Sequence, residues 1–181
     1  MGMPWETKLT GMAAAIGLLA MTAGSVAAQD ESTNRVAAKT DWSVFVEENP
    51  TECWSVSAPK ETVNTRDGRV VAVNRGDILL YVFYRPGEDV KGQVTFTGGY
   101  PFASGSTVNV TVGSNEFEMF TEGEWAWPAS PADDAKIITA MKRGAQAVLT
   151  ARSSRGTTTQ DTFSLLGFTA AVEDAETRCG R

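Results

Sequence analysis

The stretch ILLYVFYRPG, residues 78–87, decides the fold class of this chain. Its first seven residues form an uninterrupted apolar run that is rich in aromatic side chains, and Arg85-Pro86-Gly87 ends it. A run of this length bounded by turn residues is typical of a β-strand in the interior of a sheet. We therefore expect residues 78–84 to form a central strand that is buried on both faces.

Similar strand patterns continue on both sides of this run. The segments with alternating apolar and polar side chains, or with a short apolar run, are 42–47, 54–57, 70–73, 94–97, 108–112, 147–151 and 158–165. Roughly nine or ten short strands with frequent turn signals are typical of an all-β sandwich or barrel. The sequence therefore predicts an all-β fold.

One helix interrupts the strands shortly before the C-terminal hairpin. Ser130 is a suitable N-cap and Pro131 suits the first turn of the helix. Lys142 and Arg143 suit the last turn, and Gly144 follows as a stop signal. A second short helix is expected over residues 170–177.

The N-terminal segment has the features of a secretory signal peptide. Lys8 precedes an uncharged apolar run over residues 11–23, and small residues follow up to Ala28. The run is shorter than the roughly 20 residues that span a bilayer, although a retained anchor helix is the alternative. We expect a signal peptide over 1–28, a flexible leader over 29–40, and a single β-sandwich domain over 41–179. The mature chain would then have no transmembrane segment and would reside in the periplasm, or at the surface or outside the cell.

The chain contains two cysteines, Cys53 and Cys179, which lie near the two ends of the predicted domain. Export to an oxidising compartment favours a disulfide bond between them. The loop-entropy model gives such a link about 4–5 kcal/mol of stabilisation. The alternative is a pair of separate buried thiols.

The composition argues against several kinds of catalysis. The chain has no histidine, so it lacks the usual general base and the commonest transition-metal ligand. Adjacent acidic residues remain as candidates for a carboxylate-dependent hydrolase, but adjacency is equally typical of solvated loops and helix caps. We therefore expect no enzymatic activity, no cofactor and no metal site. These acidic neighbours are Glu47 with Glu48, Asp133 with Asp134, and Glu122 with Glu124.

Trp125 and Trp127 are two residues apart, so they share a face if their segment is extended. Such a pair can form an aromatic platform for a sugar ring. The alternative is that both tryptophans face the core of the sandwich, and the pattern favours this second interpretation.

A cationic group lies within residues 135–160, which contain no acidic residue although the chain has a net charge of −6. A local positive excess can hold an anion. That function requires Lys142, Arg143, Arg152 and Arg155 to converge in space. We favour the alternative that they complete a helix end and protect a strand edge. An exported protein of this net charge is not expected to bind nucleic acid.

Several segments follow one another in a characteristic order: Asp41-Trp42-Ser43, Glu52-Cys53-Trp54, NTRDGRVVAVNRGDILLYVFYRPG, GGYPFASGS, and the C-terminal DDAKIITAMKRGAQAVLTARSSRGTTTQDTFSLLGFTAA. Together they resemble the invasion associated locus B family of secreted bacterial proteins. The resemblance implies an immunoglobulin-like β-sandwich in the periplasm or at the outer surface, with no enzymatic activity or cofactor. Many members have a second cysteine pair mid-domain, where this chain has FEMFTEGEWAW.

We therefore expect an exported, envelope-associated binding or interaction protein without catalysis, whose partner is an unknown envelope or host component. The alternative is a surface-exposed factor for host-cell invasion or adhesion. A carboxylate-dependent hydrolase is the third hypothesis.

Overall fold

The computed structural model describes residues 34–179, so the signal peptide predicted over 1–28 lies outside the described residues. The helices are α1 (Pro131–Met141) and α2 (Phe168–Cys179), and η1 (Pro86–Glu88) is a 3-10 turn. The strands are β1 (Arg35–Lys39), β2 (Trp42–Glu48), β3 (Thr51–Ser57), β4 (Glu61–Arg66), β5 (Arg69–Val70), β6 (Leu79–Arg85), β7 (Val90–Thr97), β8 (Thr107–Val112), β9 (Asn115–Glu122), β10 (Trp125–Trp127), β11 (Gln146–Arg152) and β12 (Thr158–Ser164).

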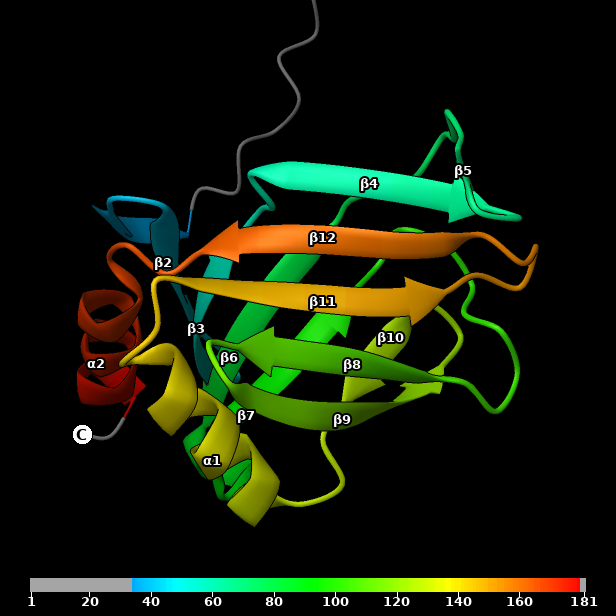
Figure 1. Cartoon of the computed structure of the whole chain (residues 1–181). Coiled ribbons are helices and arrows are strands. Elements are labelled where there is room, and N and C mark those ends of the chain that lie inside the picture. The colour runs from blue at the N-terminus through cyan, green and yellow to red at the C-terminus, as the bar shows by residue number, and fades with distance from the viewer. Residues whose placement is uncertain (1–33, 180–181) are drawn as a thin grey trace, which may run out of the picture. The chain divides into compact units, whose positions relative to one another are not determined.

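The strands form one antiparallel sheet that folds over on itself into two layers. Its order is β1-β2-β3-β6-β7-β10-β9-β8-β11-β12-β4-β5. In Figure 1, β4, β12, β11, β8 and β9 form the front layer, and β2, β3, β6 and β7 lie behind them. Phe96 of β7 meets Phe163 of β12 edge-to-face in the core, with ring centroids 6.1 Å apart. The predicted all-β sandwich with a helix before the C-terminal hairpin is confirmed.

Strand β6, formed by the run that decided the fold class, is central but buried on one face only. It pairs with β3 on one side and with β7 on the other. Leu80 and Val82 point into the core and are at most 1% exposed, whereas Tyr81 and Phe83 are only partly buried on the opposite face. The prediction that both faces are buried is wrong, because within residues 34–179 no second layer and no helix covers the outer face of β6, and its side chains there are only partly buried.

The sheet begins earlier than the sequence indicated. The sequence predicts a flexible leader over residues 29–40, but residues 35–39 form β1, which pairs antiparallel with β2. The lack of apolar periodicity concealed this strand because it lies at the sheet edge and buries little side-chain surface. Backbone hydrogen bonds to β2 hold it there instead.

Helix α1 packs against the part of β7 that β10 leaves unpaired, since β10 pairs only with Phe96 and Thr97 of that strand. Ser130 caps it as predicted, since its hydroxyl accepts a hydrogen bond from the Asp133 backbone N–H at 3.3 Å. One turn of the helix brings the Asp134 carboxylate to the Val94 backbone N–H, which donates to it at 2.8 Å. The carboxylate thereby satisfies a strand donor that no neighbouring strand pairs at that point of β7.

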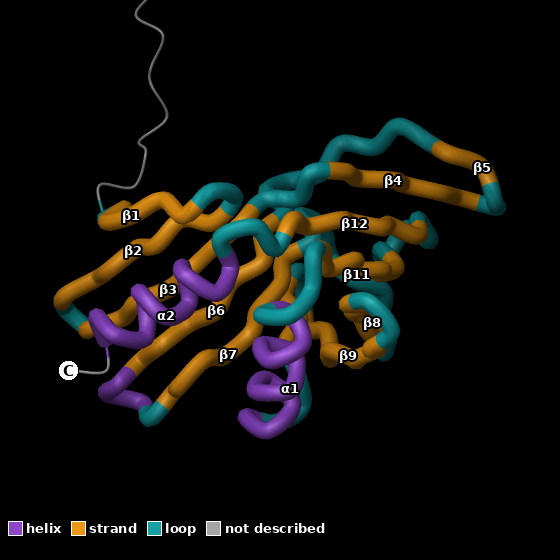
Figure 2. Tube along the Cα trace, turned by 60° about the vertical axis from the view of Figure 1, so that its left-hand side comes forward, coloured by secondary structure: helices purple, strands orange, loops and turns teal. Residues whose placement is uncertain are grey.

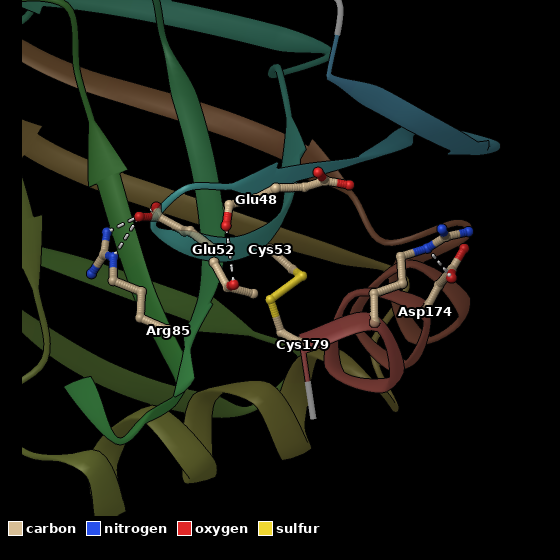
Figure 3. The surroundings of a disulfide bond; sticks show 8 residues. Glu48, Glu52, Cys53, Arg85, Asp174 and Cys179 are labelled. Atoms are coloured by element: carbon tan, nitrogen blue, oxygen red, sulfur yellow. Dashed lines mark hydrogen bonds and ion pairs between the residues drawn. A yellow bond between two sulfur atoms is a disulfide. The ribbon is translucent and has the colours of Figure 1, made fainter. Parts of the chain in front are cut away.

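Helix α2 lies across β2 and β3, as Figure 2 shows, and extends slightly beyond the predicted 170–177 at both ends. Its first residue, Phe168, packs edge-to-face on Trp42 with ring centroids 4.8 Å apart. Its last residue, Cys179, forms the predicted disulfide with Cys53 of β3, with the two Cα atoms 5.8 Å apart (Figure 3). The helix is therefore fixed to the sheet at both ends.

Candidate functional site

A strip of aromatic side chains crosses the outer face of the layer that contains β2, β3, β6 and β10. The aromatic strip consists of Phe45, Trp54, Phe83, Tyr81 and Trp125. Successive ring centroids along it are 5.4, 6.2, 5.1 and 6.1 Å apart. These spacings are typical of interacting aromatic pairs, so the rings form one continuous surface.

Strand register explains why the strip is continuous. Phe45 of β2 lies opposite Trp54 of β3, and Trp54 lies opposite Phe83 of β6. Residues paired in this way project from the same face of an antiparallel sheet. Tyr81 is two positions from Phe83 and shares that face. The first four rings thus come from three adjacent strands, and Trp125 of β10 extends the strip from Tyr81.

Charged groups border the strip along β6. The Arg85 guanidinium lies over the Phe83 ring, 4.5 Å from its centroid, and forms an ion pair with Glu52 at 2.9 Å (Figure 3). Burial, followed by the nearby negative charge of Asp77, raises the pKa of Tyr81, so its hydroxyl remains a neutral hydrogen-bonding group. The surface is therefore apolar along its middle, with polar groups at its margin.

Trp125 and Trp127 share a face, as the sequence predicted, but that face is the outer one. Ala126 between them is fully buried, whereas Trp125 is 43% exposed and continues the strip from Tyr81. Trp127 is partly buried and pairs with the exposed Phe120 of β9. The favoured interpretation, that both tryptophans face the core, is wrong, because β10 uses its small central residue for the core. Sugar binding by the pair stays a prediction.

The comparisons with known proteins agree with this architecture. The model of the invasion associated locus B (IalB) family matches residues 42–176. The chain belongs to the invasion associated locus B family. Among solved structures, the fold of this chain is similar to the crystal structure of invasion associated protein B from Bartonella henselae, with a TM-score of 0.55 and 15% sequence identity. The likeness covers 80% of this chain and 98% of that one. No curated protein matches the sequence significantly.

The four cationic residues proposed as an anion site do not converge in this IalB family member. Lys142 and Arg143 follow α1, and Lys142 is paired with Glu173 at 3.1 Å. Arg152 ends β11, and Arg155 lies in the turn beyond it. Because β11 spans seven residues between the two pairs, about 20 Å separates them. The cluster is local in sequence only, and it is not a single site.

The acidic neighbours do not form a carboxylate pair at the start of α1. Asp133 accepts hydrogen bonds from Lys136 and Ser130, and these contacts lower its pKa. Asp134 is 8% exposed, and burial raises its pKa to about 6. The two carboxylates therefore have different partners and separate structural roles.

The other acidic candidates lie on the surface. Glu47 and Glu48 are exposed at the end of β2, and Glu122 and Glu124 are exposed around the β9–β10 turn.

Within residues 34–179, no helix is long and apolar enough to cross a membrane.

A buried ion pair was missed by sequence reasoning. The Arg75 guanidinium donates two hydrogen bonds to Asp161, at 2.8 and 2.6 Å, and the two side chains are 6% and 0% exposed. Arg75 lies in the segment Asn74–Asp77, which has the composition of a surface turn. Asp161 lies on the inward face of β12, on which Thr159 and Phe163 are its neighbours. A charged residue at an inward strand position needs a buried partner, and this is the signal from which the ion pair could have been predicted.

Proposed function

We propose that this protein is an exported, non-catalytic binding protein of the bacterial envelope and that the aromatic strip is its contact surface. Membership of the invasion associated locus B family supports this proposal. The Cys53–Cys179 disulfide supports export, because such bonds persist mainly in oxidising compartments. The predicted signal peptide ends at Ala28, so cleavage there on export predicts that N-terminal sequencing of the exported protein begins at Gln29.

The uncovered position of the strip carries the proposal. Trp54 and Cys53 are neighbours on β3 and point to opposite faces, and Cys53 faces α2. Helix α2 therefore lies on the other side of the layer, and α1 contacts β7. Trp125 is 43% exposed and the other four rings are partly exposed. A continuous aromatic surface that the described residues leave partly open to water is typical of an interaction site.

The rings favour a ligand with a flat apolar face, such as a neutral sugar. The acidic side chains Glu52 and Asp77 lie beside the rings, and among the described residues a cation, Arg85, pairs with Glu52 but none pairs with Asp77. A polyanion would therefore be repelled at this surface. A neutral glycan can stack on the rings without being repelled by these carboxylates.

Binding of a neutral glycan such as chitotetraose, followed by tryptophan fluorescence, tests the proposal. Trp54→Ala and Trp125→Ala should each weaken binding about tenfold, which corresponds to about 1.4 kcal/mol. Val70→Ala is the matched control, because Val70 is 77% exposed on β5 and lies outside the strip. Equal binding by all three variants would exclude the strip as the contact surface.

The names of the family and of the similar Bartonella henselae protein favour one second candidate, a surface-exposed factor for host-cell invasion or adhesion. The two functions place the protein on different sides of the outer membrane. Protease treatment of intact cells separates them: the envelope-protein hypothesis expects protection, and the invasion hypothesis expects cleavage.

A further inference from the structure

A pocket of about 510 Å³ opens beside the turn that joins β11 to β12. It is formed by the end of β4, the segment 72–75 and the turns at 99–101 and 153–157. We call it the arginine pocket, because Arg66, Arg75 and Arg155 line it. Among the described residues of its lining, Glu124 is the single acidic one, and no member of the aromatic strip contributes to it.

Arg75 of the pocket lining is nearly fully buried and is held by several contacts. Besides its two bonds to Asp161, the Arg75 guanidinium donates to the Gly98 carbonyl at 2.8 Å and to Asn64 at 3.2 Å. It lies over the Tyr100 ring, 4.9 Å from the centroid. Because Asp161 neutralises it, Arg75 shapes the pocket without supplying net positive charge.

The rim supplies the positive charge. Arg66 and Arg155 are exposed. Arg66 donates one hydrogen bond to the Thr157 hydroxyl at 2.7 Å, which orients its guanidinium and leaves other N–H groups available. Arg155 makes no hydrogen bond or ion pair with another residue of the described chain. Two cations against Glu124 make this pocket positive in a chain whose net charge is −6.

The lining combines this charge with groups that suit a sugar. Guanidinium groups bind carboxylates through paired, charge-assisted hydrogen bonds. Tyr100 and Pro101 offer apolar surface, and Asn74 and Ser154 offer groups that can bond hydroxyls. The volume lies within the range of small-ligand pockets, about 300–1,000 Å³.

We infer that the arginine pocket binds an acidic sugar residue. Its carboxylate contacts Arg66 and Arg155, and its ring lies against Tyr100 and Pro101. This site is distinct from the aromatic strip and goes beyond the proposed function, which assigns a neutral ligand to the strip.

Calorimetric titration with trigalacturonate tests the inference, with neutral galactotriose as the paired ligand. Trigalacturonate should bind and galactotriose should not. Binding should weaken as salt rises from about 50 to about 500 mM, because exposed charges are screened. Arg66→Gln and Arg155→Gln should each weaken binding by about tenfold or more, since hydrogen bonds to charged groups are the stronger ones.

Arg152→Gln is the matched control, because it removes the same charge from the neighbouring end of β11 without touching the pocket lining. It should change the affinity less than about twofold. The inference is overturned by absent trigalacturonate binding, by equal binding of galactotriose, or by equal losses in Arg152→Gln and the two pocket variants. Trp125→Ala should bind trigalacturonate like the wild type, so failure of the strip and failure of the pocket are distinguishable.

Discussion

Replacing Asp134 by asparagine should stabilise the protein at neutral pH and leave it nearly unchanged in acid. Asp134 is 8% exposed, and its carboxylate accepts a hydrogen bond from the Val94 N–H at 2.8 Å. Burial raises its pKa to about 6, from 3.8 for an unperturbed group. Asparagine retains the accepting oxygen and removes the charge that burial disfavours.

The sign follows from proton linkage. Well below pH 3.8 the carboxyl group is protonated in both the folded and the unfolded chain, so its charge has no effect on stability. Between that pH and about 6 the unfolded chain ionises first, and the free energy of unfolding falls as pH rises. The difference between a pKa of 3.8 and one of about 6 corresponds to roughly 3 kcal/mol, which is the upper limit for the pH-dependent gain of Asp134→Asn.

Asp133→Asn is the matched control with the opposite sign. Hydrogen bonds from Lys136 and Ser130 lower the pKa of Asp133, so this carboxylate contributes stability above the unfolded pKa. That contribution is lost as pH falls through the folded pKa. Asp133→Asn should therefore be less stable than the wild type at pH 7, and this difference should vanish in acid.

Urea unfolding followed by tryptophan fluorescence, at several pH values from about 3.5 to about 7, measures both variants. The reasoning requires the advantage of Asp134→Asn over the wild type to grow with pH. A constant loss of stability at every pH would refute it, because the ionised carboxylate would then not be disfavoured by burial.

Two further predictions concern the disulfide and the buried ion pair. Cys53→Ser with Cys179→Ser should lower the free energy of unfolding by about 4–5 kcal/mol, because the unfolded chain regains loop entropy. Unreduced peptide mapping should link the two cysteines in the wild type, and two alkylatable thiols there would contradict this. Asp161→Ala should cost about 3–5 kcal/mol in urea unfolding, since it leaves Arg75 charged and unpaired in the interior. Adding Arg75→Met should restore much of that loss, and a double variant no more stable than Asp161→Ala would count against a charge effect.

The sequence predicted the features that depend on local patterns. Alternating side chains indicated the strands, and Ser130 with Gly144 marked the ends of the helical region around α1. The disulfide followed from having only two cysteines and a signal-like N-terminus. Each of these inferences needs information from neighbouring positions or from composition alone.

The candidate sites depend on contacts that sequence patterns do not contain. Arg75 and Asp161 are 86 residues apart, and only the fold brings them together. Leu79, Tyr81 and Phe83 are as apolar as a core, so the sequence predicted burial where the structure has an open face. Lys142 and Arg152 are close in sequence, but an extended strand carries them to opposite ends of the layer.

The Cys53–Cys179 bond also determines how the domain would bear mechanical force. Cys179 ends α2 and Cys53 lies near the start of β3, so the bond closes the segment from β3 to α2 into a covalent ring. Tension applied between residue 34 and Cys179 would pass through the sulfur bridge and bypass this ring. It could extend only residues 34–53, which include β1 and β2. The β6 part of the aromatic strip and the arginine pocket both lie inside the ring, so this load could not stretch the chain at either place.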